Sequence, residues 1–308
     1  MSVIWGIPYL LIRIAVRHGV PPLFLAWSRV TLAALVLVVL AWRAGTLPSV
    51  RGRWRVLLLY AIVEICIPFP LIGAGETRVA SSLAAILISS VPLIGAVLAL
   101  RFDRSERPTP VRAAGLLIGF GGVIALVGID VAGRGNALLG AGAILLAAVG
   151  YAIGPMLIKL RLGGLDARAT MGVSLAIASV LLAPFAALDP PSAVPSAGPL
   201  ACVIALGLVC TAAAFVIFSI LIAEAGTSRA TVITYVNPVI AVGLGVALLG
   251  ERPGAGSVAG LLLILAGSWL STDGRLPPGL MRMVAWRPPR RASREASEPS
   301  VLRMPAPG

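Results

Sequence analysis

The chain has 308 residues, of which 58% are hydrophobic and 12% are charged, and its mean hydropathy is +0.99. A soluble core of this length could not bury so much apolar surface, so the composition excludes an ordinary soluble domain and indicates a protein of the lipid bilayer. The formal net charge is +13, but no basic stripe with interleaved aromatic residues is present, so nucleic acid is not expected as a partner.

Apolar segments follow one another along almost the whole chain. A bilayer core about 30 Å thick is crossed by roughly 20 helical residues, and segments near this length are predicted at 1–16, 23–42, 56–75, 81–100, 111–129, 137–158, 170–188, 198–223, 230–249 and 256–271. The first segment lacks the basic start and the small-residue cleavage site of a signal peptide. We therefore predict an all-α polytopic membrane protein with ten transmembrane helices.

An internal duplication organises these segments. The stretch 81–122 recurs at 227–267 with different residues but the same skeleton, and Pro92 corresponds to Pro238. Each repeat holds five predicted spans, and an odd number of spans makes the second repeat enter the membrane in the opposite direction from the first. The expected domains are two inverted five-helix repeats at 1–130 and 137–271, followed by a Pro/Arg-rich segment at 272–308.

The basic residues predict the orientation of the chain. The loops on one side carry arginines and a lysine in 43–55, 101–112, 159–168 and at Arg229, whereas the other side has only Arg17, Arg78, Arg134 and Arg252. Basic loops stay on the cytoplasmic side of a membrane. Both termini are therefore expected in the cytoplasm, in the plasma (inner) membrane of a bacterium. The segment 272–308 has no apolar periodicity and is predicted to be a disordered tail, either solvated or bound to anionic lipid.

Two ordered sets of residues carry a family resemblance. The first half has Trp5-Gly6, Arg13, Arg29, Ser81-Ser82, Pro92, Glu106 and Gly115; the second has Tyr151-Ala152, Lys159, Thr227-Ser228, Pro238, Glu251 and Gly260. Over residues 5–271 the chain resembles EamA-type transporters of the drug/metabolite transporter (DMT) superfamily. It departs from them in its short first span and in the basic loop 101–106. The resemblance implies ten helices in an inverted repeat and secondary transport of small metabolites, often outward, without implying a particular substrate.

Prolines mark the expected substrate path. Backbone groups freed by a helix break must be satisfied within the protein or by water in a cavity, so broken helices in a bilayer indicate a central path. Breaks are expected at Pro8, Pro68, Pro92, Pro155 and Pro238. The alternative is that these prolines only kink their helices for packing.

Polar and aromatic residues near these prolines are candidate substrate contacts. Asn237 and Tyr235 precede Pro238 and offer an amide and a phenol, and an amide is costly to bury without a partner. Trp5 and Tyr151 could stack on a substrate, although aromatic residues at span ends are usually interfacial anchors.

Two charged residues, Arg29 and Glu64, lie well inside predicted spans. A charge at the bilayer centre costs at least about 2.5 kcal/mol, which makes both residues functional candidates. Glu64 could carry a coupling proton or meet a cationic substrate, or it could form a structural ion pair with Arg29. For Arg29 we favour a side chain that extends to the outer interface.

Residues for other chemistry are scarce. The only histidine is His18, the three cysteines (Cys66, Cys202 and Cys210) have no metal-ligand spacing, and no phosphate-binding glycine loop is present. We therefore expect no catalytic residue, metal or cofactor.

The predicted function is a secondary transporter, with export expected, for small metabolites such as amino acids or related amphipathic compounds. It would work by alternating access around a site in the middle of the membrane. A membrane enzyme or a structural membrane component is the alternative. Expected partners are the substrate, membrane lipid and a proton or other coupling ion. The glycine-rich fifth and tenth spans would pack within one chain, which we favour, or between two copies in a homodimer.

Overall fold

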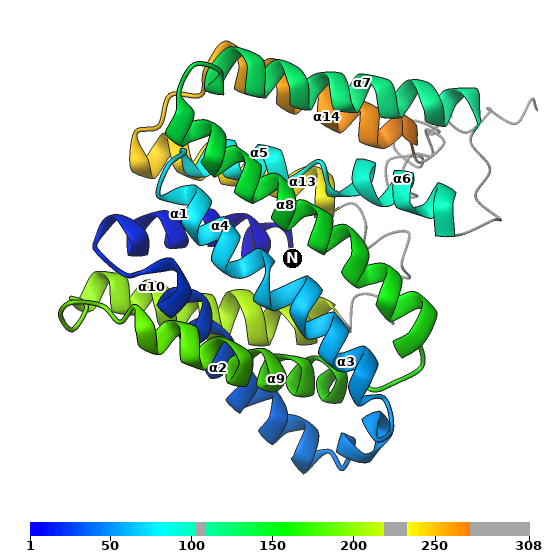
Figure 1. The fold of residues 1–308 in the computed structure, drawn as a ribbon, viewed down its shortest axis with the longest axis vertical. Helices are drawn as coiled ribbons and strands as arrows, with labels where there is room; N and C mark the ends of the chain where they lie inside the picture. The colour runs from blue at the N-terminus through cyan, green and yellow to red at the C-terminus, as the bar shows by residue number, and fades with distance from the viewer. Residues whose placement is uncertain (103–108, 219–232, 272–308) are drawn as a thin grey trace, which may run out of the picture. The chain divides into compact units, whose positions relative to one another are not determined.

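A computed structural model describes residues 1–102, 109–218 and 233–271, which belong to one unit, Met1–Arg275. Within these ranges the chain is helical and contains no β-strand (Figure 1). The helices are α1 (Ser2–Arg17), α2 (Pro22–Arg43), α3 (Trp54–Tyr60), α4 (Pro68–Glu76), α5 (Ser81–Ile88), α6 (Val91–Phe102), α7 (Pro110–Leu126), α8 (Gly135–Leu157), α9 (Ala167–Leu188), α10 (Ala197–Gly207), α13 (Ile233–Leu249) and α14 (Ala255–Ser271). A short 3₁₀ helix, η1 (Leu47–Val50), and four π-helical turns, η2 (Ala61–Cys66), η3 (Val127–Val131), η4 (Ile158–Leu162) and η5 (Leu208–Ala213), complete the described elements.

Many of these helices are suited to a bilayer. Within the described residues, seven helical segments are long and apolar enough to cross a membrane, and 236–249 and 255–271 are shorter apolar helices. The bounds agree closely with the predicted spans: 23–42 is observed as Pro22–Arg43 and 170–188 as Ala167–Leu188. The prediction of a helical protein with several helices suited to a membrane is thereby confirmed. The count of ten spans in an inverted repeat stays a prediction.

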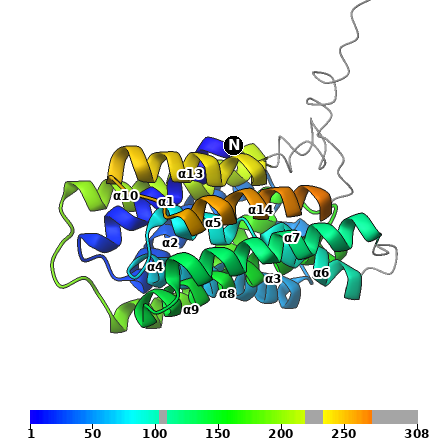
Figure 2. The ribbon, with the colours of Figure 1, turned by 90° about the horizontal axis from the view of Figure 1, so that it is seen from above.

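Helices α7 and α14 lie side by side in both ribbon views (Figures 1 and 2). Their backbones meet at glycines: a side chain added at Gly122 would overlap Leu263 and the Gly260 backbone, and one added at Gly267 would overlap the Gly119 backbone. Gly121 faces open space. The prediction that these glycines mediate contact within one chain is therefore confirmed for α7 and α14.

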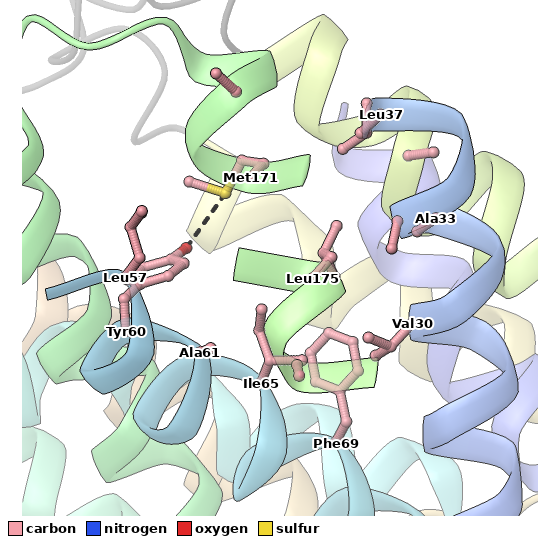
Figure 3. Packing of buried hydrophobic residues seen from close by; sticks show 14 of the residues in the cluster. Val30, Ala33, Leu37, Leu57, Tyr60, Ala61, Ile65, Phe69, Met171 and Leu175 are labelled. Atoms are coloured by element: carbon pink, nitrogen blue, oxygen red, sulfur yellow. Dashed lines mark hydrogen bonds between the residues drawn. The ribbon is translucent and has the colours of Figure 1, made fainter. Parts of the chain in front are cut away.

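Helices α2 and α9 form a second close pair. The backbone of Leu37 and Val38 lies against Gly172, and the hydroxyls of Thr31 and Ser179 are 2.6 Å apart and hydrogen-bonded. The core beside this pair is shown in Figure 3, where residues of α2, α3, η2, α4 and α9 interdigitate. In that core the Tyr60 hydroxyl donates a hydrogen bond of 3.5 Å to the sulfur of Met171.

Two of the five expected proline breaks coincide with interruptions. Pro68 is the first residue of α4 and follows the π-helical turn η2. Near Pro92 the helix stops at Ile88 and resumes at Val91, so the interruption lies at Ser89 and Ser90, two to three residues earlier than predicted. The hydroxyls of both serines donate to carbonyls of the preceding turn, and the same carbonyls accept from the backbone N–H groups of these serines.

The other three expected breaks are wrong. Pro8, Pro155 and Pro238 lie inside α1, α8 and α13, which continue through them. A proline removes one N–H donor from a helix, but packing of neighbouring helices can keep the helix continuous in a membrane protein. All three helices have such neighbours, since α1 and α13 contact each other and α8 contacts α4.

Candidate functional site

Arg29 lies inside the protein. Its side chain is 9% exposed, its Nε donates a hydrogen bond of 2.8 Å to Oγ1 of Thr211, and its guanidinium carbon is 4.2 Å from the centre of the Phe69 ring. The expectation that Arg29 extends to the outer interface is therefore wrong. A cation over an aromatic face and a hydroxyl acceptor together replace part of its lost hydration.

A group of polar side chains surrounds this arginine. Tyr9, Tyr151, Cys210 and Glu76 are close enough to interact electrostatically with Arg29, and the Tyr151 ring meets Phe69 edge to face with centroids 6.4 Å apart. We call Tyr9, Arg29, Glu76, Tyr151 and Thr211 the central polar cluster. Its members come from α1, α2, α4, α8 and η5, so segments from both halves of the sequence contribute to it.

Glu64 lies apart from Arg29. The carboxylate sits on the π-helical turn η2 and faces α8 at Gly154, where an added side-chain carbon would overlap it. Its Oε2 is buried and has no hydrogen-bond partner within the described residues. Tyr60 and Tyr151 are the groups with which it interacts electrostatically. The structural ion pair with Arg29 that the sequence left open is not formed.

Of the other predicted site residues, Trp5 belongs to α1 and Asn237 contacts α1. Trp5 packs against Phe215 and Phe218, with ring centroids 6.3 and 4.8 Å away. Asn237 on α13 places its backbone carbonyl against Gly6. Tyr235 belongs to the first turns of α13, and its side chain lies outside the described residues. The structure thus brings Tyr151 and Arg29 together and sets Trp5 in an aromatic group of its own.

Sequence reasoning missed Glu76. The predicted third span ended at Gly75, whereas α4 includes Glu76 as its last residue and buries it completely, at 0% exposed. The guanidinium of Arg13 donates a hydrogen bond to the backbone carbonyl of Glu76. The available signal was an acidic residue directly after an apolar span, together with an arginine inside the first span.

In the sequence Glu251 stands out only as a motif residue, whereas in the structure its carboxylate accepts hydrogen bonds at the start of α5. Its Oε1 accepts hydrogen bonds from the backbone N–H (2.8 Å) and hydroxyl (3.0 Å) of Ser81, and its Oε2 accepts one from the backbone N–H of Ser82 (2.9 Å). Burial alone would raise the pKa of the Glu251 carboxyl, but the hydrogen bonds from Ser82 and Ser81 outweigh burial and hold this pKa below its ordinary value. An ionised Glu251 therefore caps the N-terminus of α5, where the helix dipole favours a negative charge.

Asp130 makes the reciprocal contact. Its carboxylate accepts from the backbone N–H of Gly256 at 3.1 Å and from that of Ser257 at 2.6 Å, at the N-terminus of α14. A residue of the first half thus caps a helix of the second, and Glu251 does the reverse. These two caps tie the halves together at helix ends.

Two other features concern where a ligand could bind. A hollow of about 380 Å³ lies between the start of α2 and the end of α4, lined by residues that include Pro22, Pro70, Thr77 and Asp189, and none of the central polar cluster lines it. Among the described residues, no group of three or more His, Cys, Asp or Glu side chains could hold a metal ion.

Comparison with known proteins identifies the family. A model described as the EamA-like transporter family matches residues 1–128 and again 138–272. The uncharacterized inner membrane transporter YedA of Escherichia coli K12 is 31% identical over 260 residues, covering 82% of this chain and 81% of YedA. Protein PagO of Salmonella typhimurium is 38% identical over 133 residues, covering 42% of this chain and only 41% of PagO.

A solved crystal structure supports the fold. It aligns with a TM-score of 0.61 at 22% sequence identity, over 92% of this chain and 98% of the other. The matches to the family model and to YedA span most of the residues whose helices and buried polar cluster are described above. The chain therefore belongs to the EamA-like transporter family and is an integral membrane protein of the transporter type.

Proposed function

We propose that this protein is a secondary transporter that moves small metabolites by alternating access around the central polar cluster. The observation that supports this most directly is the buried Arg29, held over Phe69 and bonded to Thr211 across the two halves of the chain. A buried cation in a membrane protein is costly and marks a substrate or ion pathway. Family membership favours transport over a membrane enzyme or a structural component.

The proposed architecture is ten spans in two inverted five-helix repeats, residues 1–130 and 137–271, with 272–308 as a cytoplasmic tail. The family model supports it by matching the chain twice. The close helix pairs agree with it, because α2 with α9 and α7 with α14 are the second with the seventh span and the fifth with the tenth. Related spans that meet in pairs are what a pseudo-two-fold axis in the membrane plane produces.

The proposed substrates are amino acids or related amphipathic compounds, moved outward. Arg29 is suited to a carboxylate, since a guanidinium presents several donors in a plane. Tyr151 and Trp5 offer aromatic surface, and Glu64 and Asn237 with Tyr235 would complete the polar lining along the path. A proton or another ion would supply the driving force, and a homodimer remains a separate proposal.

Transport in vesicles tests this function. The purified full-length protein, reconstituted in liposomes, should move at least one member of a panel of labelled amino acids and amines faster than protein-free liposomes do. Imposing a pH gradient should change the rate if the ion is a proton. Rates equal to those of protein-free liposomes for the whole panel, at verified incorporation, would argue against a metabolite transporter of this substrate class.

The orientation has its own test. Because the basic loops predict that both termini are cytoplasmic, a reporter enzyme active only outside the cytoplasm should stay inactive when it is fused after Ser271. The same reporter inserted at the loop that contains Arg134 should be active. Activity of the Ser271 fusion would overturn the proposed cytoplasmic position of this end of the chain and, with it, the proposed orientation.

A further inference from the structure

Glu76 is the most completely buried charged side chain of the described residues. It is 0% exposed, and neither of its carboxyl oxygens has a hydrogen-bond partner there. The other two buried charged side chains, Arg29 and Glu251, are both hydrogen-bonded. Glu76 therefore lacks the compensation that its buried neighbours have.

An ionised carboxylate in this position would be unstable. Removing such a group from water costs several kcal/mol even after relaxation, unless a cation and hydrogen-bond donors replace the water. A buried carboxyl without such partners usually takes up a proton and becomes neutral. Complete burial without hydrogen-bond partners therefore favours the neutral carboxylic acid form of Glu76 in this conformation.

Charged and titratable groups approach Glu76 from several elements. Helix α1 contributes Tyr9 and Arg13, α2 contributes Arg29, and the loop between α13 and α14 contributes Glu251. Of the other elements packed on α4, α8 carries Tyr151 and η2 carries Glu64. At the start of α5, the Ser81 hydroxyl and the Ser82 backbone N–H donate hydrogen bonds to Glu251. The two arginines attract an ionised Glu76, whereas Glu251 repels it.

Arg13 is the cation best placed to respond. Its guanidinium donates to the backbone carbonyl of Glu76, so it already lies beside this residue without contacting the carboxyl oxygens. Its Nε is buried and has no partner within the described residues. Its position beside Glu76 and its unpartnered Nε make Arg13 a candidate donor to the carboxylate.

We propose that Glu76 is a proton-binding site and that Arg13 is its counter-ion. In the conformation described here the carboxyl holds the proton. When the O–H bond breaks, the proton passes to water at the end of α4, where Thr77 and Arg78 are exposed, and the carboxylate accepts hydrogen bonds from Arg13. Coupling of this proton to solute movement rests on the proposed transport function, whereas proton binding by Glu76 does not.

Infrared spectroscopy of the full-length protein tests proton binding without a substrate. Wild-type protein and Glu76→Gln are compared at neutral pH in liposomes of phosphatidylethanolamine and phosphatidylglycerol. The difference spectrum should show one protonated carboxyl C=O band, because signals from Glu64 and all other carboxyls cancel. Asp189→Asn, which changes an exposed carboxylate, should leave that band in place. No difference band at neutral pH would overturn the proposal.

Two more variants keep the test decisive. If Glu76→Gln is not monodisperse, Glu76→Asp should move the band to a different frequency, and an unmoved band would overturn its assignment to Glu76. In Arg13→Gln the band should persist to higher pH than in wild type, because the carboxylate has lost its cation. An unchanged titration would remove Arg13 as the counter-ion. If the band is present but the liposomes show no transport, the proposed transport function is contradicted and proton binding by Glu76 is not.

Discussion

Gly267→Val should prevent accumulation of folded protein in the membrane. The Gly267 position lies directly against the backbone of Gly115 and Gly119 on α7, and backbone atoms cannot rotate away from an added side chain. Overpacking a close contact costs about 1–3 kcal/mol and occasionally more, and a contact with backbone belongs to the upper part of this range. The measurement is the yield of monodisperse protein after solubilisation, with thermal unfolding of whatever remains.

Gly121→Val is the matched control for this substitution. Gly121 is on α7 in the same helix pair, but nothing lies within 4 Å of the position that an added Cβ atom would occupy. Its yield and thermal stability should match wild type. If Gly267→Val also accumulated at the wild-type level, the close α7–α14 contact would not be required for the fold.

Arg29→Gln should lower transport of the substrate found in the vesicle assay by about tenfold or more while leaving the protein folded. A hydrogen bond to a charged group contributes about 1.5–3 kcal/mol, and 1.4 kcal/mol corresponds to a factor of ten. The fold should survive because Thr211, which loses its donor, still donates its own hydrogen bond of 2.8 Å to the Leu206 carbonyl. Initial rates at equal incorporation measure the effect.

Two further arginine variants sharpen this result. Arg29→Lys keeps the charge but loses the planar guanidinium, so an intermediate rate is expected if that shape is used. Arg78→Gln is the control, because Arg78 is exposed in the turn after α4 and its guanidinium donates a hydrogen bond to the Ala74 carbonyl of α4. Wild-type transport by Arg29→Gln would mean that the central polar cluster is not the substrate site.

The candidate site could be predicted from the sequence only in part. A charge inside an apolar span is visible in the sequence, so Arg29 and Glu64 were identified as candidates. Their partners were not, because the hydrogen bond of Arg29 joins residues 182 positions apart. Glu76 was missed for a related reason: it lies at the end of a span, and hydropathy does not show whether a charged residue there is buried or exposed.

Local properties explain what the sequence by itself determined. Hydropathy sums along the chain, so apolar stretches long enough for a bilayer and their approximate ends could be derived without coordinates. The resemblance to a transporter family came from the ordered motif residues of the two halves. The tertiary structure decided how each helix is rotated and which neighbours it meets. That rotation turns Gly122 into α14 and Gly121 away from it. The structure also shows that the helices around Pro8, Pro155 and Pro238 are continuous. It also buries Glu76 beside Arg13. Contacts between distant segments set these outcomes, and no local pattern encodes them.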